Sequence, residues 1–175
     1  MGSEMCIRDR AWQQARSVLE MLGLLDGSGA LTDLGRRCRR LPLHPRLARM
    51  LVAGRDTGRA GLAARLAVLL GGSVPLPSGM TDLHRQLALF QNSQVSAALN
   101  RELKPLLHGE KVETQAPRAG DVGALLLSAF PERLARRRPG KAPRFLLRNG
   151  RGAWLADDCE VADANWLVAA SLDGD

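Results

Sequence analysis

A dense cluster of basic side chains near residue 140 is the feature of this sequence most suited to chemistry. The cluster consists of Arg133, Arg136, Arg137, Arg138, Lys141, Arg144, Arg148 and Arg151. A guanidinium group presents a planar fork that matches phosphate, and each neutralised phosphate adds salt-dependent affinity for nucleic acid. A helix, a loop and a hairpin could bring these residues onto one surface. We therefore favour contact with a nucleic-acid backbone over a solvated face that pairs with neighbouring domains.

A second basic cluster lies earlier in the chain and favours a different interpretation. Its members are Arg36, Arg37, Arg39, Arg40, Arg46 and Arg49. The first four surround a short helix, so they cannot all face one way. We expect a solvated face with ion pairs here.

Motifs for catalysis are missing from the sequence. It contains no phosphate-binding G-x-x-x-x-G-K-[ST] loop, no DExH or DExD tetrad, no G-x-S-x-G elbow and no H-E-x-x-H helix. Of the dispersed histidines, His44 precedes Pro45 and suits a helix start, whereas His84 is expected to face solvent and His108 stands apart. We predict that this chain carries no catalytic residue and holds no cofactor or metal.

The cysteines and the hydropathy limit the class of protein. Cys6, Cys38 and Cys159 are odd in number and far apart, which argues against a zinc site or a disulfide framework. No stretch approaches the roughly 18 apolar residues of a membrane-spanning helix. We expect a protein of the bacterial cytoplasm with no membrane partner. The acidic pair Asp157 and Asp158 is expected to be exposed or to pack on basic surface.

Charge and aromatic content give two further limits. The chain of 175 residues carries a net charge of +7, but its first 155 residues carry +13 and its last twenty carry −6. Of the 25 basic residues, 22 are arginines. The six aromatic residues are Trp12, Phe90, Phe130, Phe145, Trp154 and Trp166. Proteins that bind single strands by stacking bases usually carry more aromatics, so this scarcity counts against stacking.

The periodicity predicts a mainly helical chain. Apolar residues repeat at intervals of three and four, with Thr32 as an N-cap and Pro45 in a first turn. The segment 121–130 is apolar almost all round and should be central. A short helix followed by a basic exit is expected over 131–141. The other expected helices are 11–22, 33–40, 45–55, 59–70, 81–90 and 93–107.

The C-terminal region has a β pattern, and both ends of the chain resemble cut ends. Strands are expected at 144–148 and 152–155, joined by an Asn149-Gly150 hairpin, and at 166–172. Two or three strands do not form a stable sheet alone, so we interpret this module as incomplete. Residues 1–10 fit no periodic pattern and are interpreted as a non-native leader.

Four segments resemble one family, and they occur in that family's order. The first is LTDLGRRCRRLPLHPRLARMLVAG, and the others are ALLLSAFPERLARRRPG, RFLLRNGRGAWL and WLVAASLDGD. All four resemble the bacterial HrpB-type ATP-dependent helicases of the DEAH class. The likeness spans about residues 11 to 175.

The resemblance implies a place within a larger protein. Residues 11–42 would be the end of a winged helix, 43–139 a helical helicase-associated (ratchet) domain, and 140–175 the start of a β-rich, OB-like domain. ATP and Mg²⁺ would be bound by RecA-like domains elsewhere in the parent protein, and no position here matches their catalytic residues. The chain's partners would be those RecA-like domains and a single-stranded nucleic acid, RNA being the family's usual label.

The mechanism implied by the resemblance is mechanical. The helical domain would close a channel over a single strand, and ATP-driven movement of the RecA-like domains would shift that strand. The candidate phosphate contacts are Arg133, Arg136, Arg137, Arg144 and Arg148.

Two other classes of function stay open. A stand-alone nucleic-acid-binding module predicts micromolar or tighter binding that falls steeply with salt. A helical protein-interaction domain predicts strand binding that is absent or insensitive to salt, and affinity for an acidic partner. Neutralising Arg136, Arg137 and Arg138 together would separate these classes.

Overall fold

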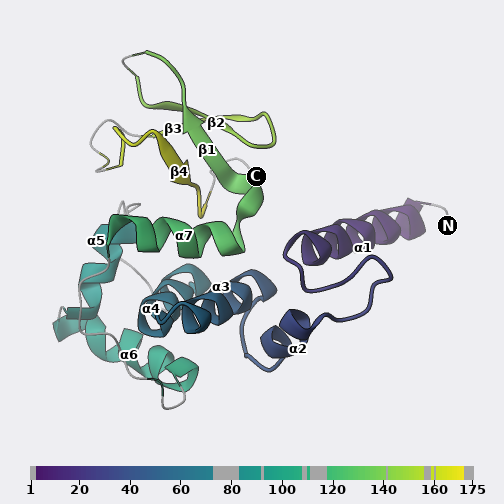
Figure 1. Ribbon diagram of the computed structural model, residues 1–175, viewed down its shortest axis with the longest axis horizontal. Coiled ribbons are helices and arrows are strands. Elements are labelled where there is room, and N and C mark those ends of the chain that lie inside the picture. Colours follow the sequence, from purple (N-terminus) through teal and green to yellow (C-terminus); the bar gives the residue numbers. More distant parts are fainter. Residues whose placement is uncertain are drawn as a thin grey trace.

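The chain is mainly helical, with a small antiparallel sheet near its C-terminus (Figure 1). The computed structural model describes residues 3–72, 83–91, 93–107, 110, 118–140, 142–155, 159 and 161–171. The helices are α1 (Ser3–Met21), α2 (Asp33–Arg39), α3 (Pro45–Asp56), α4 (Ala60–Gly71), α5 (Leu83–Ala88), α6 (Ser93–Leu107) and α7 (Ala119–Ala129), with 3₁₀ turns η1 (Leu89–Gln91) and η2 (Pro131–Arg133). The strands are β1 (Leu134–Arg137), β2 (Arg144–Leu147), β3 (Gly152–Trp154) and β4 (Trp166–Val168). The predicted fold class is confirmed.

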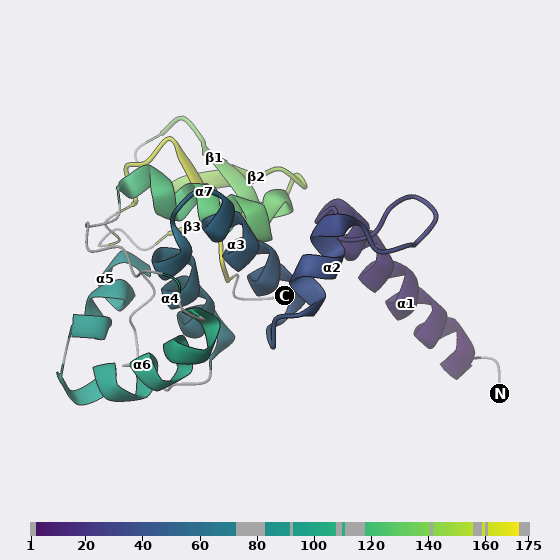
Figure 2. The same cartoon turned by 60° about the horizontal axis from the view of Figure 1, so that its bottom comes forward.

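The first helix is longer than its periodicity predicts and is only partly packed. It begins at Ser3 rather than near residue 11, so most of the expected leader continues the helix. Val18 and Leu19 pack with Leu22 against the start of the bundle, but Trp12 is 72% exposed. Figure 2 shows the N-terminal half of α1 extending away from the rest of the molecule. The apolar stripe of a helix predicts which residues can be buried, but they become buried only where another element packs against them.

The expected helix starts are confirmed where α2 and α3 begin. The Thr32 hydroxyl accepts the Gly35 amide at 3.0 Å. His44 Nδ1 accepts the Arg46 amide at 3.4 Å, and Pro45 occupies the first turn. Both caps satisfy amides that a helix N-terminus otherwise leaves unpaired.

The main core lies between α3, α4, α6 and α7. Met50, Leu51, Leu66 and Leu99 are fully buried there. Small residues allow α3 and α4 to approach closely: a Cβ placed on Gly54 would lie 2.3 Å from the Cβ of Ala63. The central position expected for α7 is confirmed, because α7 contacts α3 on one side and β4 on the other (Figure 1).

The region after α7 differs from the expected helix with a basic exit. Only Pro131–Arg133 forms a helical turn, and the chain then enters β1. β1 lies inside a four-stranded sheet with the order β3-β2-β1-β4, and all neighbours are antiparallel. Pairing on both edges and complete burial of Ala135 outweigh the local helical preference of this segment. The expected strands at 144–148, 152–155 and 166–172 are confirmed over shorter ranges.

Candidate nucleic-acid interface

The two faces of the sheet have opposite character. Ala135, Phe145 and Leu147 project from one face and are at most 2% exposed, forming a small core of their own. The alternate residues project from the other face, because successive side chains on a strand point to opposite sides. We define this exposed sheet face by Arg136, Arg144, Leu146, Gly152, Trp154 and Trp166.

Strand register sets the arrangement of the exposed sheet face. Arg136 on β1 lies between Leu146 on β2 and Trp166 on β4, and its guanidinium carbon is 5.8 Å from the centre of a Trp166 ring. Arg144 on β2 lies directly opposite Trp154 on β3. An arginine at this distance from an indole is attracted to the ring by a cation–π interaction. The register therefore sets an arginine directly beside each of these two tryptophans.

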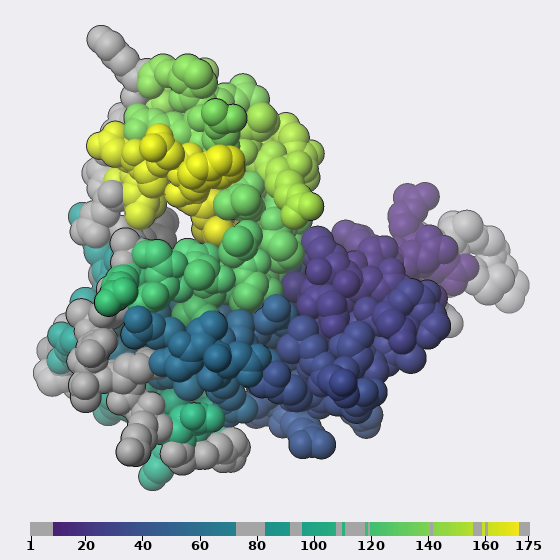
Figure 3. All heavy atoms as spheres, in the orientation of Figure 1, coloured from purple at the N-terminus to yellow at the C-terminus, as the bar shows by residue number. Residues whose placement is uncertain are grey.

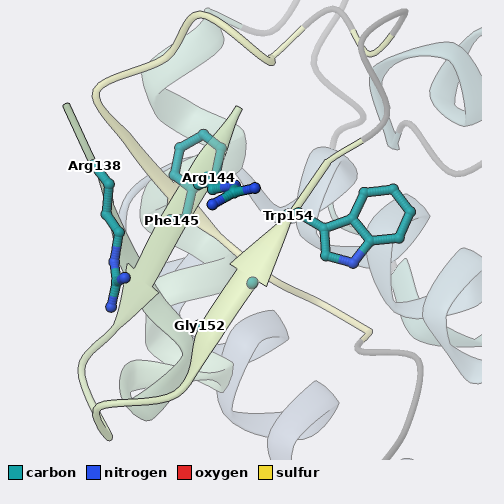
Figure 4. A pocket seen from close by; sticks show the side chains of 6 residues that line it. Arg138, Arg144, Phe145, Gly152 and Trp154 are labelled. Carbon is teal, nitrogen blue, oxygen red and sulfur yellow. The ribbon is translucent and has the colours of Figure 1, made fainter. Parts of the chain in front are cut away.

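A shallow hollow of about 480 Å³ lies at β2 and β3, where it borders the exposed sheet face. Arg138, Arg144, Phe145, Gly152, Ala153 and Trp154 line it. Figure 4 shows the Arg144 guanidinium between the side chains of Arg138 and Trp154. A Cβ added to Gly152 would meet nothing within 4 Å, so the backbone of β3 is open to an approaching ligand here.

Three of the five predicted phosphate contacts lie at this surface. Arg136 and Arg144 are exposed on the face itself, and Arg148 is exposed just beyond the end of β2. Among the described residues, none of the three forms an ion pair. Their positive charge is therefore available to an anionic partner.

The other two predicted contacts are engaged within the molecule. Arg137 lies opposite Phe145 on the buried face, and its Nη1 is 3.0 Å from Asp163 Oδ1. Arg133 donates to the Ala170 carbonyl at 2.9 Å and lies over the ring of Phe130 at 5.2 Å. The sequence pattern could not separate these two arginines from the other three, because it did not reveal β1 and therefore gave no register.

Three members of the second basic cluster form ion pairs, as expected. Arg36 pairs with Asp33 within α2, and Arg46 pairs with Glu132. Arg37 on α2 holds Asp56 at the end of α3 with two hydrogen bonds, which lower the pKa of the Asp56 carboxyl below its ordinary value. Arg37 therefore connects α2 to α3, and Arg46 connects α3 to η2.

Sequence reasoning missed Trp154 and Trp166 as members of the exposed sheet face. They are 78% and 58% exposed, whereas tryptophan is highly buried on average. A two-residue turn at Asn149-Gly150 would set Phe145 opposite Trp154. The loop instead has three residues, 148–150, and this one-residue shift sets Arg144 opposite Trp154, so the turn signal alone assigns Trp154 to the wrong face. No such short hairpin links Trp166 to its partner strand β1.

The residues that the structure describes show neither a metal-binding cluster nor a membrane-spanning helix. None of the described His, Cys, Asp and Glu side chains gather in a group of three that could hold a metal ion. No described helix is both long enough and apolar enough to cross a lipid bilayer. Asp157 and Asp158 lie outside the described residues.

Comparisons with known proteins agree on one relative. No family model matches the chain. The ATP-dependent RNA helicase HrpB of Escherichia coli (strain K12) is 34% identical over 158 residues, which are 90% of this chain and 18% of that protein. The crystal structure of the E. coli DExH-box NTPase HrpB matches with a TM-score of 0.73 and 33% identity, covering 92% of this chain and 19% of that one.

A second solved structure, described as the E. coli DEAH/RHA helicase HrpB, matches with a TM-score of 0.71 and 32% identity over 88% of this chain and 18% of that one. The chain therefore spans about a fifth of the length of the relatives it matches. Sequence and fold agree over the same range, and we conclude that this chain is homologous, over about 90% of its length, to a region of the HrpB-type DEAH/RHA helicases.

Proposed function

We propose that this region binds single-stranded nucleic acid, RNA in the first instance, as part of an ATP-dependent helicase. One observation carries the proposal: Arg136, Arg144 and Arg148 are exposed together at one sheet surface and form no ion pair among the described residues. Three such arginines bind phosphates without reading sequence, which suits a protein that moves along a strand. The relative's name, an ATP-dependent RNA helicase, agrees with this substrate.

The test is the salt dependence of binding to a fluorescent single-stranded oligouridine. We expect the wild-type affinity to fall steeply with salt. Replacing Arg136, Arg144 and Arg148 with Gln should reduce the slope of log K against log salt by about 2, since each single-strand phosphate contact contributes about 0.7. A slope unchanged from wild type would overturn the assignment to this surface.

A matched control removes the same charge elsewhere. Arg36, Arg39 and Arg40 are exposed on and beside α2, at a distance from the sheet (Figure 3). Their replacement by Gln lowers the net charge equally and should change the slope far less. Equal effects of the two triple variants would indicate that net charge alone drives binding.

The proposed ATP-hydrolysing domains are not part of this chain. RecA-like domains would bind ATP and Mg²⁺, and their opening and closing would move the strand held here. The natural gene should therefore encode, in the same protein, a G-x-x-x-x-G-K-[ST] loop and a DExH tetrad. A protein with both motifs should hydrolyse ATP faster when single-stranded RNA is added, and the triple Gln variant at Arg136, Arg144 and Arg148 should weaken that stimulation. A gene without these motifs would contradict this part of the proposal.

A further inference from the structure

We infer that the exposed sheet face binds the bases of a single strand by stacking, with Trp154 and Trp166 as two separate stacking platforms. This inference rests on the proposed function. It adds that unpaired bases, and not only phosphates, contribute to binding at this surface. Trp154 is 78% exposed and Trp166 is 58% exposed, although both belong to regular strands. An open indole on a rigid strand can stack a base of any type.

Charge favours a nucleic acid over a protein as the occupant of this face. Arg136 and Arg144 lie on it, and Arg138 lines the hollow beside Trp154. No acidic side chain among the described residues projects from this face, since Asp163 pairs with Arg137 on the other side of β1. Base-stacking sites in proteins combine aromatic rings with such a positive groove.

The spacing of the two tryptophans suits an extended strand. In the order β3-β2-β1-β4 they stand on the two outer strands. Three steps of about 4.8 Å separate those strands, so the two rings lie on the order of 15 Å apart. A strand crossing the sheet would place one base on each ring and pass its phosphates over Arg136 and Arg144 between them. Gly152 leaves room for that path because it has no side chain.

The tryptophans themselves supply the signal for the experiment. The chain has three tryptophans and no tyrosine, and Trp12 lies on α1, away from the sheet. In a Trp12→Phe background, only Trp154 and Trp166 emit. We expect an oligouridine of about ten nucleotides, within the site size of an OB fold, to quench this emission as it binds. Binding without quenching would overturn the inference.

Variants at the two positions test the strength of stacking. Trp154→Leu and Trp166→Leu should each weaken oligouridine binding by about 5- to 100-fold, which corresponds to the usual contribution of one stacked base. Phe at either position should retain most of the affinity. Trp12→Leu, at a tryptophan whose 72% exposed fraction lies between those of the other two, is the matched control and should leave affinity unchanged. Because all three side chains are exposed, far-ultraviolet circular dichroism should show the same folded spectrum for each variant.

An abasic oligomer of equal length and charge separates this inference from the proposed function. Stacking predicts that it binds wild type at least 5-fold more weakly than oligouridine and is insensitive to the two Trp→Leu substitutions. Equal binding of both oligomers, still weakened by the triple Gln variant at Arg136, Arg144 and Arg148, would overturn stacking and leave phosphate binding intact. Failure of both oligomers to bind would overturn the proposed function and this inference together, and would favour a protein partner for the face.

Discussion

Arg46 on α3 and Glu132 in η2 form an enclosed ion pair that joins the helical bundle to the start of the sheet. Arg46 Nη2 lies 2.7 Å from Glu132 Oε1, and Nη1 donates to the Ala129 carbonyl at 2.7 Å. The two side chains are only 14% and 26% exposed, and the guanidinium also lies over Phe130 at 5.2 Å. One arginine thus fixes the end of α7, and with it the orientation in which β1 leaves the bundle.

Breaking this pair should destabilise the fold. We expect Arg46→Gln to lower the free energy of unfolding by about 2 to 3 kcal/mol, because it removes charge-assisted hydrogen bonds to the Ala129 carbonyl and to a partly enclosed carboxylate. The longer 3.8 Å contact of Arg133 Nε with Glu132 remains. Urea denaturation followed by circular dichroism measures the loss. Arg36→Gln is the control, because its ion pair with Asp33 is exposed on α2. It should cost about 0.5 kcal/mol or less. Equal losses in the two variants would contradict the structural importance of Arg46.

The contact between Arg37 and Asp56 should make part of the stability depend on pH. Arg37 lowers the pKa of Asp56 in the folded state below its ordinary 3.8. The unfolded state therefore binds this proton more readily, and the stabilisation is complete above about pH 5 and is lost as pH falls through the folded-state pKa. Asp56→Asn should cost about 0.2 to 1 kcal/mol at pH 7, since both side chains are about half exposed.

The same comparison at low pH tests the sign of that effect. Denaturation of wild type and Asp56→Asn at pH 7, 5, 4 and 3 should give a stability difference that is constant down to about pH 5 and then shrinks. A difference that grows on acidification would show that the pKa of Asp56 is raised rather than lowered.

Close packing of α3 on α4 should make Gly54 intolerant of a methyl group. In Gly54→Ala the new Cβ would lie 2.3 Å from the Cβ of Ala63 and 2.9 Å from the Arg59 carbonyl oxygen. We expect a loss of about 2 to 3 kcal/mol, because the helices must move apart. Gly123→Ala in α7 is the matched control: its Cβ meets nothing within 4 Å. It should stabilise the chain by about 0.5 to 1 kcal/mol through helix propensity. Thermal unfolding of both variants tests the pair.

Arg137 should behave unlike its neighbour Arg136 in a binding experiment. Arg137 faces the buried side of β1 and pairs with Asp163, whereas Arg136 lies on the exposed sheet face. Arg136→Gln should weaken oligouridine binding and reduce its salt slope by about 0.7, while Arg137→Gln should leave both unchanged. Fluorescence anisotropy at several salt concentrations measures the difference. An equal effect of the two substitutions would contradict the assignment of the two faces.

Local patterns in the sequence were sufficient for most of the helices. Thr32 and the His44-Pro45 pair mark helix starts because their capping chemistry acts over three or four residues, and both caps occur in the structure. The Asn149-Gly150 turn likewise marks the hairpin between β2 and β3. These elements could be predicted since the forces that define them lie within a few residues of chain.

The arrangement of the candidate nucleic-acid interface depends on contacts between segments that are distant in the sequence. Leu134–Arg137 has a helix-compatible composition, and only its pairing with β2 and β4 makes it a strand. Because this segment is a strand, Arg136 is exposed beside Trp166 and Arg137 pairs with Asp163 on the opposite face. Arg133, just before the strand, donates to the Ala170 carbonyl.

The sequence by itself therefore determined a mainly helical chain, its helix caps, its excess of arginine and its likeness to one helicase family. Only the tertiary structure decided which arginines are free to bind a ligand and which hold the fold together. The reason is physical: composition and periodicity fix how many charges a segment carries and how often it turns. The side of a strand on which each charge lies depends on register with strands far away along the chain.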